Sequence, residues 1–347
     1  MKCKIPTAIM ERKINGFSLW LCRGNCFANG CLYTFNNRKR ERMMSSLHNN
    51  IDLKNIYIKP NIYDVLNEAR GVSMDCNMEA NKIAMALRSI VNKSDNLTSL
   101  TIDGIRIGTL RKGKEMFYVF GMILFVKWEF YNFYDKRWLD EFYETIPKND
   151  YYDADKNLMS VTLFGVSGNL NIRNCENTIA HEIFHNYKSF KPINKKEHNL
   201  AKVANKVATA KSKSGYTELI GDIMYLLSKE EIQAFCNGAY AQIKKEIENG
   251  NRHSLEEFIE NTILYENFME LDYLINDFRM HVNEQIYNKC CDEIKALTNQ
   301  KMMPYNSFIK YVEEGRKNYL YQIGRLKSIL VDYFKLEESN IIFEKYF

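Results

Sequence analysis

Two histidines four residues apart, His181 and His185, have the types and spacing in this sequence that best suit chemistry. Each residue of a helix turns the chain by about 100°, so these two positions lie within about 40° of one another and both imidazoles can reach one metal ion. Glu182 follows the first histidine on the same side of the helix, close enough to hold a water molecule at that metal. A metal, a water and a carboxylate so arranged can hydrolyse an amide bond.

The flanks of this motif support a helix with two different faces. Ile179, Ile183, Tyr187 and Phe190 fall mostly on the side away from the histidines, which predicts a core face behind a cleft-facing one. The segment before it, 158–172, is β-branched and contains two glycines, so we expect one or two strands there. Asn174 would then be the helix N-cap.

This context resembles the zincin metallopeptidases, in which an antiparallel edge strand runs beside the substrate cleft and the H-E-x-x-H helix lies under it. The resemblance covers roughly residues 77–250, and only the five residues 181–185 match sharply. It implies a zinc-dependent peptide hydrolase. Zn²⁺ would be bound by His181 and His185, and Glu182 would be the general base.

The third ligand expected from the resemblance is a downstream carboxylate, as in gluzincins, and two candidates compete. Glu231 opens the segment "EIQAF", and Ala234 one turn later would let that helix approach the motif helix. The E-x-x-A form is similar to gluzincin-like peptidases of bacteria and phages. Glu218, with Asp222 four residues on, instead looks like the thermolysin-type arrangement. We favour Glu231 as the third zinc ligand.

An ordinary structural role for Glu231 stays open at this point. Ser228 and Glu231 have the spacing of a capping box, in which the glutamate only satisfies a backbone N–H at the start of a helix. His198 follows His185 without the spacing of the metzincin pattern, so we expect it to be solvated. Tyr187, Tyr216 and His281 are available as oxyanion partners, and the sequence does not choose between them.

The order of elements predicts an α+β fold: a zincin-like core with a small, mostly antiparallel sheet packed on the motif helix, then a mainly helical C-terminal part. We expect a helix from about residue 77, a hairpin turning at Asp103-Gly104, and a buried strand or pair of strands over 116–126. Helices are expected over 198–211, 216–227, 230–248 and 255–280 and in most of the remaining residues. The predicted division is 1–75 (short strands and turns), 76–250 (catalytic) and 251–347 (helical).

Composition narrows the class of protein. The net charge of +5 is a weak excess for 347 residues, and the basic run 38–42 is short, so we expect no nucleic-acid partner. The nine cysteines are odd in number and mostly scattered, which argues against a disulfide framework. The cluster Cys22, Cys26 and Cys31 fits no common zinc spacing. No apolar run is long enough to span a bilayer and no secretory signal stands out, so we expect no membrane partner and a cytoplasmic location, in a bacterium or phage.

Two functions of different kinds follow. The first is a zinc metallopeptidase that acts on a peptide or protein substrate. The second is a non-catalytic structural or interaction protein on a zincin-like scaffold. The sequence leaves the substrate and the oligomeric state open.

Overall fold

The computed structural model describes residues 73–143, 145–189 and 213–334, together with 203, 204, 206, 207 and 210. The cysteine cluster at 22–31, the basic run 38–42, Phe190 and His198 lie outside these residues. The described chain divides into two compact units, Asp75–Tyr187 and the residues from Lys188 onward. The three-part division expected from the sequence stays a prediction.

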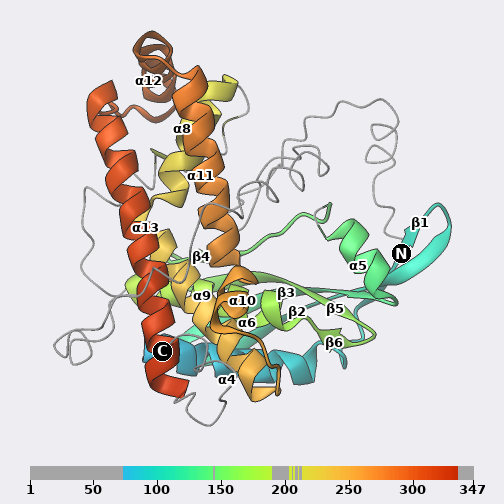
Figure 1. Cartoon of the computed structure of the whole chain (residues 1–347). Coiled ribbons are helices and arrows are strands. Elements are labelled where there is room, and N and C mark those ends of the chain that lie inside the picture. The colour runs from blue at the N-terminus through green and yellow to red at the C-terminus, as the bar shows by residue number, and fades with distance from the viewer. Residues whose placement is uncertain are drawn as a thin grey trace. The chain divides into compact units, whose positions relative to one another are not determined.

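The first unit combines one six-stranded sheet with three helices (Figure 1). Its elements are α4 (Met74–Ile90), β1 (Leu97–Ile102), β2 (Ile105–Val119), β3 (Met122–Phe133), α5 (Lys136–Phe142), β4 (Tyr151–Asp153), β5 (Leu158–Val166), β6 (Asn169–Leu170) and α6 (Ile172–Ser189). The strand order is β1-β2-β3-β5-β4, with β6 paired to β5. Only β3 and β5 run parallel, so the expected mostly antiparallel sheet is present as a small mixed sheet. The α+β composition is confirmed.

Two-residue turns close three of the four antiparallel pairs of this sheet. Asp103-Gly104 joins β1 to β2, as predicted, and Phe120-Gly121 joins β2 to β3. Ser167-Gly168 joins β5 to β6. Every residue of these three pairs has a positive φ. Two-residue turns of that conformation match the right-handed twist of the strands they connect, and glycine adopts it without steric cost.

The segment 116–126 forms two strands, but its expected burial is wrong for the end nearest the turn. Val119, Leu124 and Val126 are buried, whereas Met116, Tyr118, Met122 and Ile123 are exposed. Met116, Tyr118 and Ile123 alternate with the buried residues and lie on the opposite face of the hairpin. Met122 pairs with Val119 on the core side and is exposed beside the turn. A continuous apolar run conceals that alternation, because both faces carry apolar side chains.

The second unit is helical in all the residues that the structure assigns to regular elements. Its described helices are α8 (Gly215–Leu226), α9 (Lys229–Glu248), α10 (Leu255–Glu260), α11 (Ile263–His281), α12 (Glu284–Thr298) and α13 (Tyr305–Phe334). They share one apolar core that includes Phe235, Phe268, Phe278, Phe308 and Tyr319. The helical C-terminal part is therefore confirmed.

The expected helix 255–280 is two helices, α10 and α11. Thr262 separates them: its hydroxyl donates to the Ile259 carbonyl at 2.6 Å and accepts from the Tyr265 N–H at 3.3 Å, which ends one helix and caps the next. The apolar periodicity continues across the break, so pattern alone does not reveal it.

Two ion pairs, one partly buried and one buried, tie the long helix α13 to its neighbours in the second unit. Arg316 binds Asp272 of α11 through two nitrogens, at 2.5 and 2.7 Å. Lys327 binds Glu256 of α10 at 2.9 Å. Among the described residues, no helix has both the length and the apolarity needed to cross a bilayer.

Candidate metal centre

The motif helix α6 is buried along most of its length. His181 and Glu182 are 0% exposed, and His185 is half-buried. Ile179 and Ile183 are also 0% exposed, so the predicted core face of this helix is confirmed for these two residues. Buried histidine and glutamate side chains on a helix are uncommon, since polar groups lose hydration unless they gain partners.

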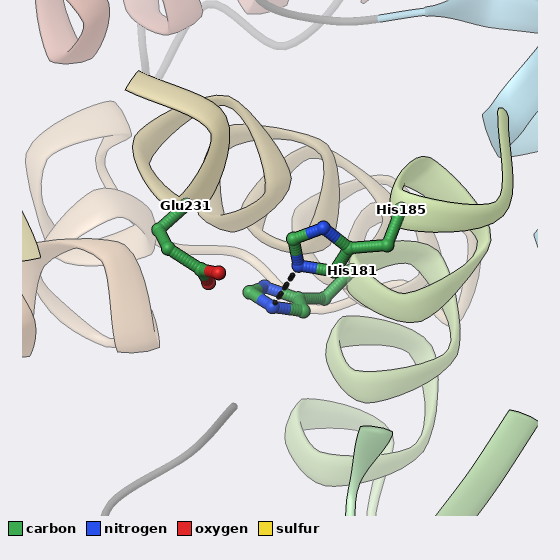
Figure 2. A group of neighbouring side chains, drawn as sticks. All are labelled: His181, His185 and Glu231. Carbon is green, nitrogen blue, oxygen red and sulfur yellow. Dashed lines mark hydrogen bonds between the residues drawn. The ribbon is translucent and has the colours of Figure 1, made fainter. Parts of the chain in front are cut away.

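The two histidines converge on one point. Their Nε2 atoms lie 3.0 Å apart and their ring centroids 4.8 Å apart (Figure 2). Two nitrogens bound to one tetrahedral zinc at about 2.0–2.1 Å would stand about 3.3 Å apart. The rings therefore need a separation only a few tenths of an ångström wider to share an ion.

Glu231, in the first turn of α9, completes the group. One ligand atom from each of His181, His185 and Glu231 lies within 4.8 Å of the other two, and this is the one such group of three found among the described residues. Figure 2 shows the carboxylate of Glu231 directed toward the two imidazoles. Two imidazoles and one carboxylate are a donor set that a catalytic zinc uses, with a position left for water.

The capping-box interpretation of Glu231 is wrong. Ser228 is the N-cap of α9, but its side chain makes no cap hydrogen bond. Glu231 Oε2 instead accepts a hydrogen bond from the Tyr225 hydroxyl at 3.2 Å. A true capping box occurs at α10, where Ser254 and Glu257 exchange both hydrogen bonds. The same Ser-x-x-Glu spacing therefore forms a capping box at α10 and not at α9.

The rival carboxylate, Glu218, has a different environment. It forms an ion pair with Lys213 at 3.1 Å, and the Lys213 ammonium also donates to the Val207 carbonyl at 2.9 Å. Asp222 lies one turn further along α8, and burial, followed by the nearby charge of Glu218, raises its pKa to about 7. The structure groups Glu231, rather than Glu218, with the two histidines.

The start of α6 is fixed to the sheet by two asparagines. The helix begins at Ile172, so the prediction that Asn174 is its N-cap is wrong. Asn171 accepts from the Asn174 N–H at 3.2 Å in the manner of a cap. Asn174 is buried, and its Oδ1 accepts from the Phe164 N–H of β5 at 2.9 Å.

An ion pair holds α6 to α4. Arg88 donates from Nη2 to both carboxylate oxygens of Glu176, at 2.7 and 2.6 Å, and from Nε to one of them at 3.2 Å. Glu176 is 5% exposed. Bidentate arginine–carboxylate contacts restrict both distance and angle, so this pair fixes the orientation of the helix five residues before His181.

The end of α6 is fixed by Asn186, directly after His185. Its Nδ2 donates to Asn157 Oδ1 at 2.9 Å, and Asn157 Nδ2 donates in turn to the Ile123 carbonyl at 2.5 Å. Sequence reasoning missed Asn174, Asn186 and Asn157 as positioning residues. The hydrogen-bond partners of these asparagines are distant in sequence, so no local sequence pattern identifies the asparagines as positioning residues.

The three oxyanion candidates lie in different surroundings. Tyr187 packs its ring 5.3 Å from that of Phe120. Tyr216 is 40% exposed. His281 pairs with Asp277 at 2.9 Å on an exposed helix end. His281 does not belong to the group formed by His181, His185 and Glu231.

Comparison of the chain with models of protein families, with curated proteins and with solved structures returned no match. The side chains of α6 and α9 are therefore the features from which a function can be inferred.

Proposed function

We propose that this protein is a zinc-dependent hydrolase that cleaves peptide bonds. The observation that supports the proposal is the approach of His181, His185 and Glu231, whose ligand atoms lie within 4.8 Å of one another. Glu182, adjacent to one of these ligands, has the residue type and helix position of a general base.

Each side chain has a separate role in this proposal. His181 and His185 hold the ion from one helix, and Glu231 supplies the third, anionic ligand. Zinc with such ligands lowers the pKa of water to about 7 and polarises a carbonyl group. Glu182 accepts the proton of the attacking water and delivers it to the leaving nitrogen, which completes hydrolysis without a covalent enzyme intermediate.

Cleavage of a mixed peptide library by the purified protein tests the proposal. We expect products that disappear with a chelator and return when zinc is added. Glu182→Gln keeps the size of the side chain but removes its basicity, and it should lower the rate at least about 100-fold because general acid–base catalysis contributes that much or more. Zinc content of Glu182→Gln should match that of the wild type.

Glu284→Gln is the matched control, since Glu284 is an exposed acid in the first turn of α12. It should cleave at the wild-type rate. A wild-type protein that binds zinc and leaves every peptide and protein substrate intact would reject the hydrolase. That outcome would favour the alternative, a non-catalytic interaction protein on this scaffold.

A further inference from the structure

The closed end of the β2–β3 hairpin exposes four large apolar side chains. Their exposed fractions are 70% for Met116, 73% for Tyr118, 41% for Met122 and 55% for Ile123. Single exposed apolar residues are ordinary on protein surfaces, but here Met116, Tyr118 and Ile123 share one face of the hairpin, and Met122 lies beside the turn on the other face. The tip is therefore apolar on both faces, and exposed apolar surface of this kind marks interaction sites.

The register of the hairpin arranges charge behind this apolar tip. Tyr118 pairs with Ile123, Met116 with Phe125, and Lys114 with Lys127. These three pairs are two positions apart along each strand, so they share one face. From the turn inward, that face changes from apolar to cationic.

The two lysines oppose one another directly, which is unfavourable for the hairpin alone. The next pair on the same face, Lys112 and Glu129, is an ion pair with an N–O distance of 2.7 Å, so its charges offset one another. Lys114 Nζ lies over the Phe125 ring, 4.8 Å from its centroid. An anionic partner would relieve the repulsion between Lys114 and Lys127.

The turn between β2 and β3 has an aromatic residue, Phe120, in a backbone conformation that is unfavourable for it. Phe120 has φ +48°, a left-handed conformation that bulky residues seldom adopt and for which asparagine, aspartate or glycine is usual. Its ring packs against Tyr187 at the end of α6. Strain of this kind persists where the surroundings impose it, and it gathers at functional positions.

We propose that the tip of this hairpin docks on an anionic lipid bilayer. Met116, Tyr118, Met122 and Ile123 enter the boundary between headgroups and acyl chains, while Lys114 and Lys127 contact lipid phosphates. Apolar and aromatic side chains backed by lysines are the combination that binds such a surface without spanning it. The lysine stems extend along apolar surface and keep their ammonium groups at the headgroups.

This proposal is independent of the hydrolase and departs from the expectation of no membrane partner. That expectation depended on the lack of an apolar run long enough to span a bilayer, which a docking hairpin does not need. The docked hairpin contacts the end of the motif helix through Phe120 and Tyr187, so docking would place the bilayer near that helix.

Sedimentation of the full-length protein with sucrose-loaded vesicles tests the docking surface. We expect binding to vesicles of phosphatidylcholine with about 30% phosphatidylserine, and at least tenfold weaker binding to phosphatidylcholine alone, because each lysine near an anionic surface adds favourable energy. Higher salt should weaken the binding. The variant Met116→Ser/Tyr118→Ser/Ile123→Ser should lower the partition coefficient at least tenfold, and so should Lys114→Glu/Lys127→Glu.

The matched control is Met78→Ser/Met85→Ser, which changes two methionines of α4 that are 56% and 60% exposed. It should bind vesicles as the wild type does, and all variants should keep the wild-type circular dichroism spectrum. Wild-type protein that stays in the supernatant with both vesicle types would overturn the proposal. So would equal binding by the tip variant, or a wild-type dimer in sedimentation velocity that the tip variant abolishes without any lipid binding.

Discussion

At the scale of single residues, Glu231 and Glu218 are the same side chain in two environments. Glu231 approaches the histidine pair, whereas Glu218 is neutralised by Lys213. A carboxylate that already has a cationic partner gains less from a metal ion than one that faces imidazole nitrogens. The local partners of each glutamate therefore predict which one the metal needs.

We predict that Glu231→Ala lowers zinc affinity by at least about 100-fold, since even residues that only support metal ligands cost 10–100-fold when removed. Glu218→Ala should retain zinc at the wild-type stoichiometry. Mass spectrometry of bound zinc after gel filtration, followed by titration against a chromogenic chelator, measures both. Loss of zinc from Glu218→Ala alone would show that the ligand assignment is wrong.

The sequence could predict much of the candidate site at this scale, but not all of it. The i, i+4 spacing of His181 and His185 is local, and helix geometry turns it directly into a shared direction. Glu231 was ambiguous because a capping glutamate and a ligand have the same spacing. Asn174 was misassigned because its side chain accepts from the Phe164 backbone, a partner that sequence periodicity does not identify.

At the scale of elements, two helices of the second unit, α9 and α10, both begin after a serine N-cap, Ser228 and Ser254. Ser254 accepts from the Glu257 N–H at 3.2 Å, and the Ser254 N–H donates to the Glu257 carboxylate at 2.7 Å. Ser228 occupies the same position before α9 without a side-chain cap bond. The two serines therefore differ in what they contribute to their helices.

We predict that Ser254→Ala lowers the free energy of unfolding by about 1 kcal/mol, the usual contribution of a serine N-cap. Ser228→Ala should change it by no more than a few tenths of that value. Urea denaturation followed by circular dichroism compares the two. An equal loss of unfolding free energy in both variants would mean that Ser228 caps α9. That result would support the capping-box role of Glu231.

The elements themselves were largely predictable, and their pairings were not. Asp103-Gly104 between two alternating runs indicated a hairpin, and the structure confirms it. The parallel pairing of β3 with β5 depends on a crossover through α5 and β4, which no local signal specifies. The break between α10 and α11 falls at Thr262, whose hydroxyl caps α11, and the apolar periodicity does not mark it.

At the scale of the whole molecule, each compact unit contains an aspartate with a raised pKa, namely the buried Asp150 and the partly buried Asp222. Burial is the main cause in both and raises the pKa of Asp150 and of Asp222 to about 7. Thr162 donates its N–H to Asp150 Oδ1 at 2.5 Å, which lowers the pKa but only in part. The folded chain therefore holds these two protons more tightly than the unfolded chain, in which an aspartate has its ordinary pKa of 3.8.

The sign of the pH dependence follows from this difference. The stabilising contribution is complete below about pH 4 and is lost as the pH rises through about 7. We predict that Asp150→Asn removes about 2–3 kcal/mol of the fall in unfolding free energy between pH 5 and pH 8, because one pKa unit corresponds to about 1.4 kcal/mol. Asp222→Asn should act in the same direction.

Urea denaturation at pH 5 and pH 8 measures this effect, with the exposed Asp155→Asn as control. The control should keep the wild-type difference between the two pH values. If Asp150→Asn keeps it as well, the carboxyl is ionised in the folded protein at pH 5.

The two-residue turns of the sheet also restrict how the length of this chain can vary in evolution. Side chains alternate between faces with a period of two, so a single-residue insertion at Phe120-Gly121 that shifted the register would exchange the faces of one strand. Tyr118 and Met116 would then turn inward, and Phe117 would turn out. Among homologous chains, insertions should be rare at this turn and should gather in the segment between α5 and β4, where no strand register is at stake.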